Sequence, residues 1–360
     1  MRFTLDFSHH SWARDREGRA PARTLDIARA ADAAGIDAIW VSEDPEGWDA
    51  FALLGAIAAV TTHAQLGTSV TSPYPRHPNL LAASVATLDR LSAGRAVLGL
   101  GRGQTEWHRD ALGVDTGEPL AVLAETIALL RGWWAPPHRV SSPDGARFRV
   151  RDWERAVSPL QTQAPILLAA AGPKAMQLAA EAADGVIFNL LTSGAFLAEA
   201  IPRLRASTEA AGRDPESLCF VLRTTIDVVT DDASERRALD RAKSIFALVS
   251  TLPGMDRLVS LAGFDVPAIL DEVRTLIRGD ETLAAGGGFP ERRRQGDLAA
   301  ARQAIPDALI RELGIIGDLA TVRARLKSLE RLGVTHVAVM PPDDAVSTEA
   351  WRRLLGDLRQ

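Results

Sequence analysis

Two hydrophobic periods alternate along this chain of 360 residues. Short segments in which apolar residues are continuous or fall at every second position are typical of β-strands, and they are bounded by glycine, proline or polar clusters. We predict eight such strands, over residues 2–8, 37–42, 65–71, 95–101, 165–171, 185–190, 218–230 and 335–340.

The segments between these strands are rich in alanine and leucine at helical spacing. They predict helices over 21–34, 50–62, 79–91, 119–134, 173–183, 194–211 and 320–332, a longer helical region after Thr230, and a final helix over 347–358. Eight strand–helix units predict the α/β class and a (β/α)8 TIM barrel. A doubly wound sheet is the alternative if two of these strands are false.

Three segments break the alternation, over 104–117, 136–163 and 252–317. The second contains Asp144 and Gly145 between alternating residues, which predicts a hairpin. We interpret these segments as insertions after strands 4 and 7 of a single TIM-barrel domain spanning 1–360.

Composition narrows the class of protein. A net charge of −5 argues against binding to nucleic acid or to a membrane surface, because both need clustered positive charge. The one basic run, Arg292 to Arg294, is typical of a solvated turn. A single cysteine, Cys219, excludes an internal disulfide and suits a reducing cytoplasm. No apolar run reaches the length of a membrane span, and the amino terminus lacks a signal-peptide pattern. We therefore expect a small-molecule substrate.

In a barrel, functional groups gather at the carboxyl ends of the strands. In the first strand Phe3, Leu5 and Phe7 share one face, so Asp6 on the other face points into the barrel. A carboxylate there suits proton transfer, and a buried aspartate paired to an arginine is the structural alternative.

The second strand is followed directly by Glu43 and Asp44, and then by Trp48. Two acids and an indole offer a charge and a stacking face, whereas helix capping and a surface tryptophan are the alternative. His9 and His10 follow the first strand, but no His/Cys cluster or HExxH motif accompanies them, so we predict no metal site.

Glycines mark the end of the fourth strand, in the sequence GLGRGQ. Gly99, Gly101 and Gly103 are spaced by two, which indicates close approach of a flat ligand or another backbone. The pattern is not the dinucleotide fingerprint GxGxxG.

The fifth strand ends in AAAGPK, where Gly172 forms a turn, Pro173 begins a helix and Lys174 follows. Free amides at a helix start, together with a lysine, favour an anion such as phosphate. Asn189 ends the sixth strand, and Arg223 and Asp227 are candidate inward polar groups of the seventh.

Two blocks of the sequence resemble a known family. They are GTSVTSPYPRHPNLLAASVATLDRLSAGRAVLGLGRG and PILLAAAGPKAMQLAAEAADGVIFN. Together they resemble the luciferase-like flavin-dependent superfamily, within it the coenzyme F420-dependent oxidoreductases, and most of all the methylene-tetrahydromethanopterin reductase branch. The resemblance implies a (β/α)8 barrel with the cofactor lying across its mouth.

The resemblance also implies roles for particular residues. Ser69 and Val70 match the family's non-prolyl cis peptide behind the deazaflavin ring, and Thr71 would face that ring. The turn at Ala171, Gly172, Pro173 and Lys174 would hold the cofactor phosphate. The other residues that we assign to cofactor binding are Glu43, Trp48, Gly101, Gly103, Gln104 and Asn189.

Three positions depart from the family pattern. Asp44 stands where the family commonly has histidine, Gln104 where it often has an acid, and Asp6 where the reductases have glutamate. The resemblance implies hydride transfer between F420 and a small organic substrate in a homodimer, with Asp6, or Asp44 as second choice, moving the proton. Trp12, Trp48 and Trp107 would shape the apolar pocket. The alternatives are an FMN-dependent luciferase-like monooxygenase and a non-catalytic flavin-binding protein.

Overall fold

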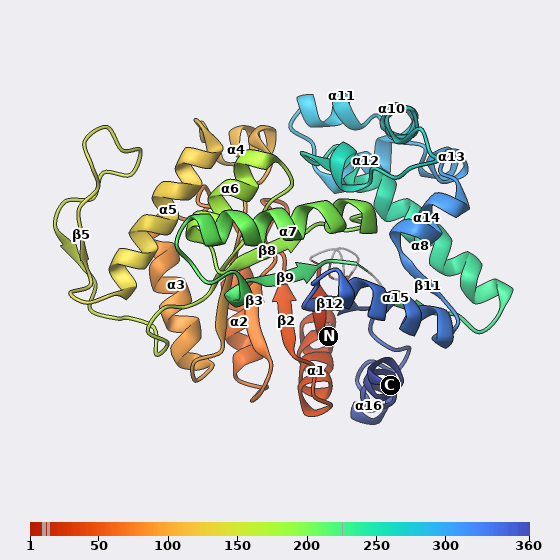
Figure 1. Cartoon of the computed structure of the whole chain (residues 1–360), viewed down its shortest axis with the longest axis horizontal. Helices are drawn as coiled ribbons and strands as arrows, with labels where there is room; N and C mark the ends of the chain where they lie inside the picture. Colours follow the sequence, from red (N-terminus) through yellow and green to blue (C-terminus); the bar gives the residue numbers. More distant parts are fainter. Residues whose placement is uncertain (9–11, 13–14, 225) are drawn as a thin grey trace.

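Eight parallel strands close into a barrel in the computed structural model, which describes residues 1–8, 12, 15–224 and 226–360 (Figure 1). His9 and His10 lie outside the described residues. The order around the barrel is β1-β12-β9-β8-β7-β4-β3-β2. The predicted TIM barrel is confirmed, with each predicted strand contributing one stave. The staves are β1 (Arg2–Phe7), β2 (Ala38–Val41), β3 (Gln65–Thr68), β4 (Ala96–Leu100), β7 (Ile166–Ala169), β8 (Gly185–Phe188), β9 (Cys219–Leu222) and β12 (His336–Val339).

Helices surround this barrel, as the helical periods predicted. Several begin at a side chain that accepts a hydrogen bond from the first turn, as Asp49, Ser193, Asp318 and Ser347 do. The outer helices are α1 (Ala20–Ala33), α2 (Ala50–Ala58), α3 (Pro78–Leu91), α5 (Pro119–Trp134), α6 (Pro173–Ala182), α7 (Gly194–Ala210), α15 (Leu319–Arg331) and α16 (Thr348–Arg359). A short 3₁₀ turn, Pro215–Ser217, precedes β9.

The barrel interior is filled by side chains. Trp40 is fully buried, and its indole lies so close to Gly67 that a Cβ on this glycine would stand 2.4 Å from the ring. Trp40 belongs to a separate apolar cluster with Ala38, Val97, Leu167, Ile187 and Val221. This filled interior leaves room for a ligand only at an end of the barrel.

The predicted strand over 218–230 is wrong in its extent. β9 ends at Leu222, and after a break β10 (Ile226–Val228) pairs in parallel with β11 (Ile315–Gly317) in a separate two-stranded sheet. Asp227 therefore leaves the barrel, and its carboxylate is paired with Arg241 of the next helix. Of the two polar groups predicted for the seventh strand, Arg223 stays at the end of the barrel strand and lines a cavity there.

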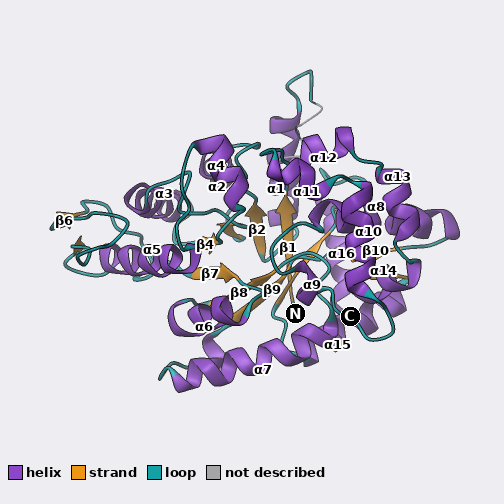
Figure 2. Ribbon diagram, turned by 90° about the horizontal axis from the view of Figure 1, so that it is seen from above, coloured by secondary structure: helices purple, strands orange, loops and turns teal. Residues whose placement is uncertain are grey.

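Between β10 and β11 the chain forms a group of helices, here called the helical excursion (residues 232–313; Figures 1 and 2). It has its own apolar cluster, which includes Phe246, Leu270 and Ile310. The excursion begins twenty residues before the 252 that we expected. Its members are α8 (Asp232–Val249), α9 (Met255–Leu258), α10 (Val266–Leu276), α11 (Gly279–Ala284), α12 (Phe289–Gln295), α13 (Leu298–Ala304) and α14 (Asp307–Leu313).

The segments between β4 and β7 also add structure. α4 (Thr105–Leu112) follows the glycine loop. β5 (Arg139–Val140) and β6 (Trp153–Glu154) form the predicted antiparallel hairpin, and its tip turns at Gly145, which has a φ of +82°.

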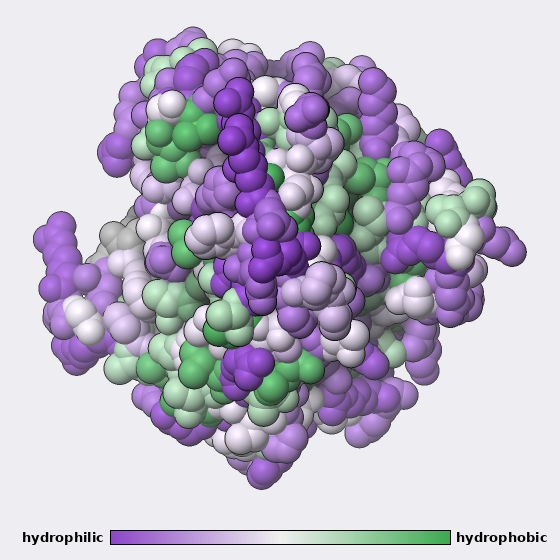
Figure 3. All heavy atoms as spheres, turned by 90° about the vertical axis from the view of Figure 1, so that its left-hand side faces the viewer, coloured by the Kyte–Doolittle hydropathy of each residue, from purple (hydrophilic) through white to green (hydrophobic). Residues whose placement is uncertain are grey.

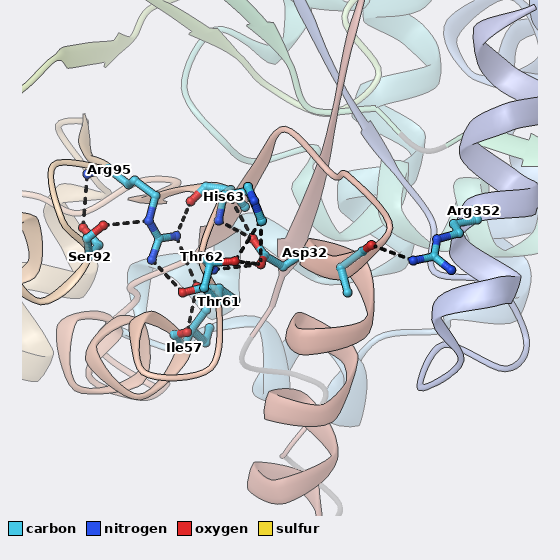
Figure 4. Close-up of polar contacts among 10 residues, drawn as sticks. Asp32, Ile57, Thr61, Thr62, His63, Ser92, Arg95 and Arg352 are labelled. Atoms are coloured by element: carbon cyan, nitrogen blue, oxygen red, sulfur yellow. Dashed lines mark hydrogen bonds and ion pairs between the residues drawn. The ribbon is translucent and has the colours of Figure 1, made fainter.

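At the amino-terminal end of the barrel, a polar network ties α1 to the loop before β3 (Figure 4). The Asp32 carboxylate accepts hydrogen bonds from the backbone N–H groups of Thr62, His63 and Ala64 at 2.7–3.0 Å. Burial alone would raise the pKa of Asp32, but these hydrogen bonds outweigh it and the pKa is lowered. Arg95 clasps the same loop through the carbonyls of Thr61 and Ala64. This network lies at the end of the barrel opposite the carboxyl ends of the strands, and it stabilises the fold.

Among the described residues, none of the helices combines the length and the apolar character that a bilayer crossing requires. The same part of the chain holds no group of three or more His, Cys, Asp or Glu side chains suited to a metal ion.

Candidate active site

A cavity of about 1160 Å³ opens at the carboxyl ends of the barrel strands. All eight strands, or the loops that follow them, contribute to its wall, and residues of α1, α4, α5 and the helical excursion supply the rest. Its size suits a cofactor together with a small substrate. Most of the residues that we assigned to the site line it: Asp6, Asp44, Ser69, Val70, Gly101, Gly103, Gln104, Ala171, Gly172, Pro173, Lys174 and Asn189.

The wall after β3 and β4 is built around the peptide between Ser69 and Val70. This peptide is cis, as the resemblance implied. A Cβ on Gly101 would stand 2.7 Å from Val70 Cγ2, and one on Gly99 would stand 2.0 Å from the Thr68 carbonyl oxygen. The glycines at 99 and 101 are thus explained by the approach of the neighbouring segment.

Three predicted cofactor residues do not line the cavity. The Glu43 side chain is 8% exposed and accepts hydrogen bonds from the Thr71 hydroxyl and, at 3.1 Å, from Arg76. Trp48 donates to the Ser42 carbonyl at 2.8 Å and packs edge-on against Trp12, with ring centroids 4.7 Å apart. Glu43, Thr71 and Trp48 therefore brace the wall, while Trp12 and Trp107 belong to it.

Two polar side chains of this wall are buried without a hydrogen-bond partner among the described residues. Ser69 is 1% exposed and Gln104 is 2% exposed, and neither the Ser69 hydroxyl nor either end of the Gln104 amide is paired. Buried polar groups are almost always hydrogen-bonded, so unpaired ones that line a cavity indicate a polar ligand. The edge of a heterocyclic ring, which carries donors and acceptors, fits this wall.

The start of α6 forms another part of the cavity wall. Gly172 is the N-cap of this helix without a side-chain cap, Pro173 is its first residue and Lys174 its second. A Cβ on Gly172 would meet nothing within 4 Å, so the turn is open to a ligand. The helix dipole, the amides of the first turn and the lysine favour an anion here. Nearby Asn189 is held by its own loop, because its Oδ1 accepts from the Leu190 N–H at 2.8 Å.

Asp6 and Arg223 meet across β12. β12 lies between β1 and β9 in the barrel, and its small Ala338 lies in register with Thr4 of β1. Arg223 Nε donates to Asp6 Oδ2 at 2.6 Å, and both side chains line the cavity. Asp6 thus points inward as predicted and is paired to an arginine. Its other oxygen, Oδ1, has no hydrogen-bond partner among the described residues.

The helical excursion covers one side of the cavity. Trp107 Nε1 donates to the Gly287 carbonyl at 3.2 Å, and Trp107 packs edge-on against Phe289. Arg292 is 1% exposed, lies over both rings and donates to the Leu248 carbonyl at 3.0 Å. Burial lowers the pKa of Arg292 to about 10. The prediction that residues 292–294 form a solvated turn is therefore wrong, since they lie in α12 and one of them is in the core.

Our reading of the sequence missed part of the cavity. Thr224 was missed because the seventh strand was predicted too long. With the strand end placed at Leu222, Arg223 and Thr224 would have been recognised as residues at a strand end. The cavity residues of the excursion carry no motif. They are Ile245, Leu248, Val249, Leu252, Pro253, Gly254, Asp256, Arg257, Leu258, Phe289 and Arg293.

A closed TIM barrel with a cofactor-sized cavity at its carboxyl end defines the class of this protein. Residues 1–336 match the family model described as luciferase-like monooxygenase. The chain belongs to this family, which confirms the resemblance seen in the sequence.

Relatives and neighbours agree with this assignment. The chain is 28% identical over 315 residues to a 5,10-methylenetetrahydromethanopterin reductase of Methanolobus tindarius, covering 88% of this chain and 89% of that protein. It is 34% identical over 213 residues to an F420-dependent glucose-6-phosphate dehydrogenase of Kineococcus radiotolerans, covering 54% and 60%. The solved coenzyme F420 dependent tetrahydromethanopterin reductase from Methanopyrus kandleri superposes with a TM-score of 0.75 over 99% of this chain and 98% of that one. At 21% identity, this last likeness shows the fold.

Proposed function

We propose that this protein is an F420-dependent oxidoreductase that transfers a hydride between the deazaflavin and a small organic substrate. One observation carries the proposal: the same cavity holds two features. Ser69 and Gln104 are buried polar groups without a hydrogen-bond partner among the described residues, and Gly172 to Lys174 form an open anion site. A ring with a phosphate-bearing side chain needs both. The F420-dependent dehydrogenase among the relatives supports the choice of cofactor.

The residues present fit this group. Ser69, Val70 and Gly101 would support the ring, Gln104 would meet its polar edge, and the α6 turn with Lys174 would hold the phosphate. When bound, the cofactor supplies or accepts the hydride, which is the redox part of the chemistry. The barrel orients the reactants, and the cover formed by Trp107 and Phe289 excludes water.

Reduction of a substrate double bond consumes one hydride and one proton. Asp6 is the residue that we propose to hold that proton, because it lines the cavity and Arg223 fixes its orientation. Asp44, which also lines the cavity, is the second choice. In the oxidative direction the same carboxylate accepts the proton that the substrate releases.

Titration of the purified protein with F420 and with FMN tests this proposal. We expect F420 to quench the fluorescence of the cavity tryptophans with a saturable binding curve, and FMN to bind much more weakly. A substrate screen that follows the deazaflavin absorbance then measures turnover. Binding of neither cofactor would contradict the proposal.

A second function has support in the family description, which names monooxygenases. In that case the ligand is reduced FMN and the reaction consumes oxygen. Tight FMN binding with oxygen uptake in the same titration would favour it. If the cofactor bound but no substrate in the screen was turned over, and if Asp6→Asn and Asp44→Asn left both results unchanged, a non-catalytic flavin-binding protein would be favoured.

We further propose that the protein is a cytoplasmic homodimer. Five of its exposed large apolar side chains lie on α3 or on the segment tied to it through Arg155 and Arg90: Leu80, Leu91, Trp153, Val157 and Leu160. Figure 3 shows the side of the molecule that carries the hairpin and α5, with apolar patches between polar ones. Light scattering on Leu91→Asp and Trp153→Asp variants tests the dimer, and a wild-type monomer would contradict it.

A further inference from the structure

The end of β9 places two polar side chains in the cavity that the proposed cofactor site does not use. Arg223 is 19% exposed, and Thr224 is 1% exposed with no partner for its hydroxyl among the described residues. Both line the cavity. They directly follow β9, whereas the ring wall, which comprises Ser69, Val70, Gly101 and Gln104, follows β3 and β4, and the anion turn follows β7.

The guanidinium of Arg223 is used on one side only. Its Nε donates to Asp6 Oδ2 at 2.6 Å, and within the described residues no hydrogen bond from its two terminal nitrogens is found. A guanidinium held in this way keeps two parallel N–H groups at its far end. That end matches the two oxygens of a carboxylate and is most effective where water is scarce.

Charge in the cavity points the same way. The chain carries a net charge of −5, yet six cationic and three acidic residues line the cavity. Lys174, Arg257 and Asp256 lie near the anion turn, since Gly254 approaches Ala171 there. The remaining wall still has a positive surplus, with Arg23, Arg102, Arg223 and Arg293 against Asp6 and Asp44.

We propose that the substrate is an organic carboxylate whose anionic group binds Arg223 through its two terminal nitrogens and accepts a hydrogen bond from the Thr224 hydroxyl. This inference rests on the proposed function for the identity of the reaction. It assigns a substrate class to the same cavity. With its carboxylate at β9, the substrate lies beside Asp6, so the group that is reduced or oxidised is within reach of the proposed proton carrier.

The test compares carboxylates with neutral molecules of the same shape. Benzoate, cyclohexanecarboxylate and hexanoate, each beside its carboxamide, are titrated calorimetrically into the full-length protein, alone and saturated with F420. We expect each carboxylate that binds to do so more tightly than its amide. Arg223→Met should weaken carboxylate binding by about 10- to 100-fold and leave amide binding unchanged. If no carboxylate binds more tightly than its amide, the proposal is overturned.

Further variants guard against a folding defect at position 223. Arg223→Lys keeps the charge but lacks the two parallel N–H groups of the guanidinium. We therefore expect its affinity for the carboxylate to lie between the affinities of the wild type and Arg223→Met. Thr224→Val keeps the shape and should weaken binding about threefold to tenfold. Arg203→Met, which removes an exposed arginine on α7, is the matched control. If neither Arg223→Lys nor Thr224→Val alters carboxylate binding, the proposal fails. Carboxylate binding that persists in a protein unable to bind F420 would refute the proposed function and leave this subsite standing.

Discussion

Arg223 Nε lies 2.6 Å from Asp6 Oδ2, although 217 residues separate the two in the sequence. The contact joins the ends of the first and seventh barrel strands across β12, which lies between them. It fixes the orientation of one carboxylate in the cavity, where the proposed reaction exchanges a proton.

We expect Asp6→Asn to lower kcat by about 10²- to 10⁴-fold, because removal of a positioned acid or base costs that much. The Kd for F420 should change less than about threefold, because Asp6 lies outside the residues proposed to hold the ring and the phosphate. Loss of a direct charged contact to the cofactor would instead raise this Kd by about tenfold. Steady-state kinetics and cofactor titration measure the two effects. If Asp44→Asn abolished turnover and Asp6→Asn left turnover normal, the role of proton carrier would be assigned to Asp44.

Lys174→Met should raise the Kd for the cofactor by about fivefold to tenfold at low salt, because it removes a cation from the anion turn. Lys174 is exposed, so the difference from the wild type should shrink as salt is added. Fluorescence titration at two salt concentrations measures this. Lys327→Met on α15 is the control, and an equal effect there would rule out a local role for Lys174.

Gly99→Ala should lower the free energy of unfolding by about 3 kcal/mol, because a Cβ at this position would stand 2.0 Å from the Thr68 carbonyl oxygen. Gly356 on α16 is the matched control. A Cβ there meets nothing within 4 Å, so Gly356→Ala should stabilise the protein by up to about 1 kcal/mol. Urea unfolding of both variants gives the values, and equal stabilities would contradict the close packing of β3 against β4.

His336 makes stability depend on pH. Burial, assisted by the charge of Arg2, lowers the pKa of His336 to about 4, below the value of about 6.5 in an unfolded chain. The unfolded chain therefore binds a proton first as the pH falls, and the contribution of neutral His336 to stability, present above pH 6.5, is lost between about pH 6.5 and 4. The loss is about 3 kcal/mol.

The measurement is urea unfolding of wild type and His336→Gln across this pH range. We expect the variant to show a shallower decline in stability between about pH 6.5 and 4. His63→Gln provides the comparison, since the His63 side chain is 77% exposed. Identical slopes for the wild type and His336→Gln would show that His336 does not carry the effect.

The sequence predicted the barrel because each strand and helix is encoded locally. The helix Pro119–Trp134, for example, begins and ends at its predicted residues. The seventh strand was misjudged because two apolar segments, 218–222 and 226–229, flank the polar residues 223–225 and were taken as one strand. The chain leaves the barrel there to pair β10 with β11, a partner about ninety residues away that local periodicity cannot reveal.

The candidate site was predicted unevenly for a similar reason. Gly101, Gly172 and Lys174 line the cavity, and they could be singled out in the sequence because they stand in the short motifs GLGRG and AAAGPK. Glu43 does follow a strand end, as predicted. Its carboxylate, however, accepts hydrogen bonds from Thr71 and Arg76, which come 28 and 33 residues later in the sequence. Which side chains a strand end satisfies internally is decided by tertiary packing, and this determines what remains for a ligand.

The ring wall and the cover of the cavity come from different parts of the chain. The wall belongs to the barrel strands, where Gly99 and Gly101 tolerate no larger side chain, whereas the cover belongs to the helical excursion and meets the barrel through contacts such as Trp107 with Gly287. Substitutions in the excursion can therefore alter the cover of the cavity without disturbing the packing of β3 against β4. In the proposed enzyme, this division allows the excursion to change the choice of substrate while the residues proposed to hold the cofactor stay the same.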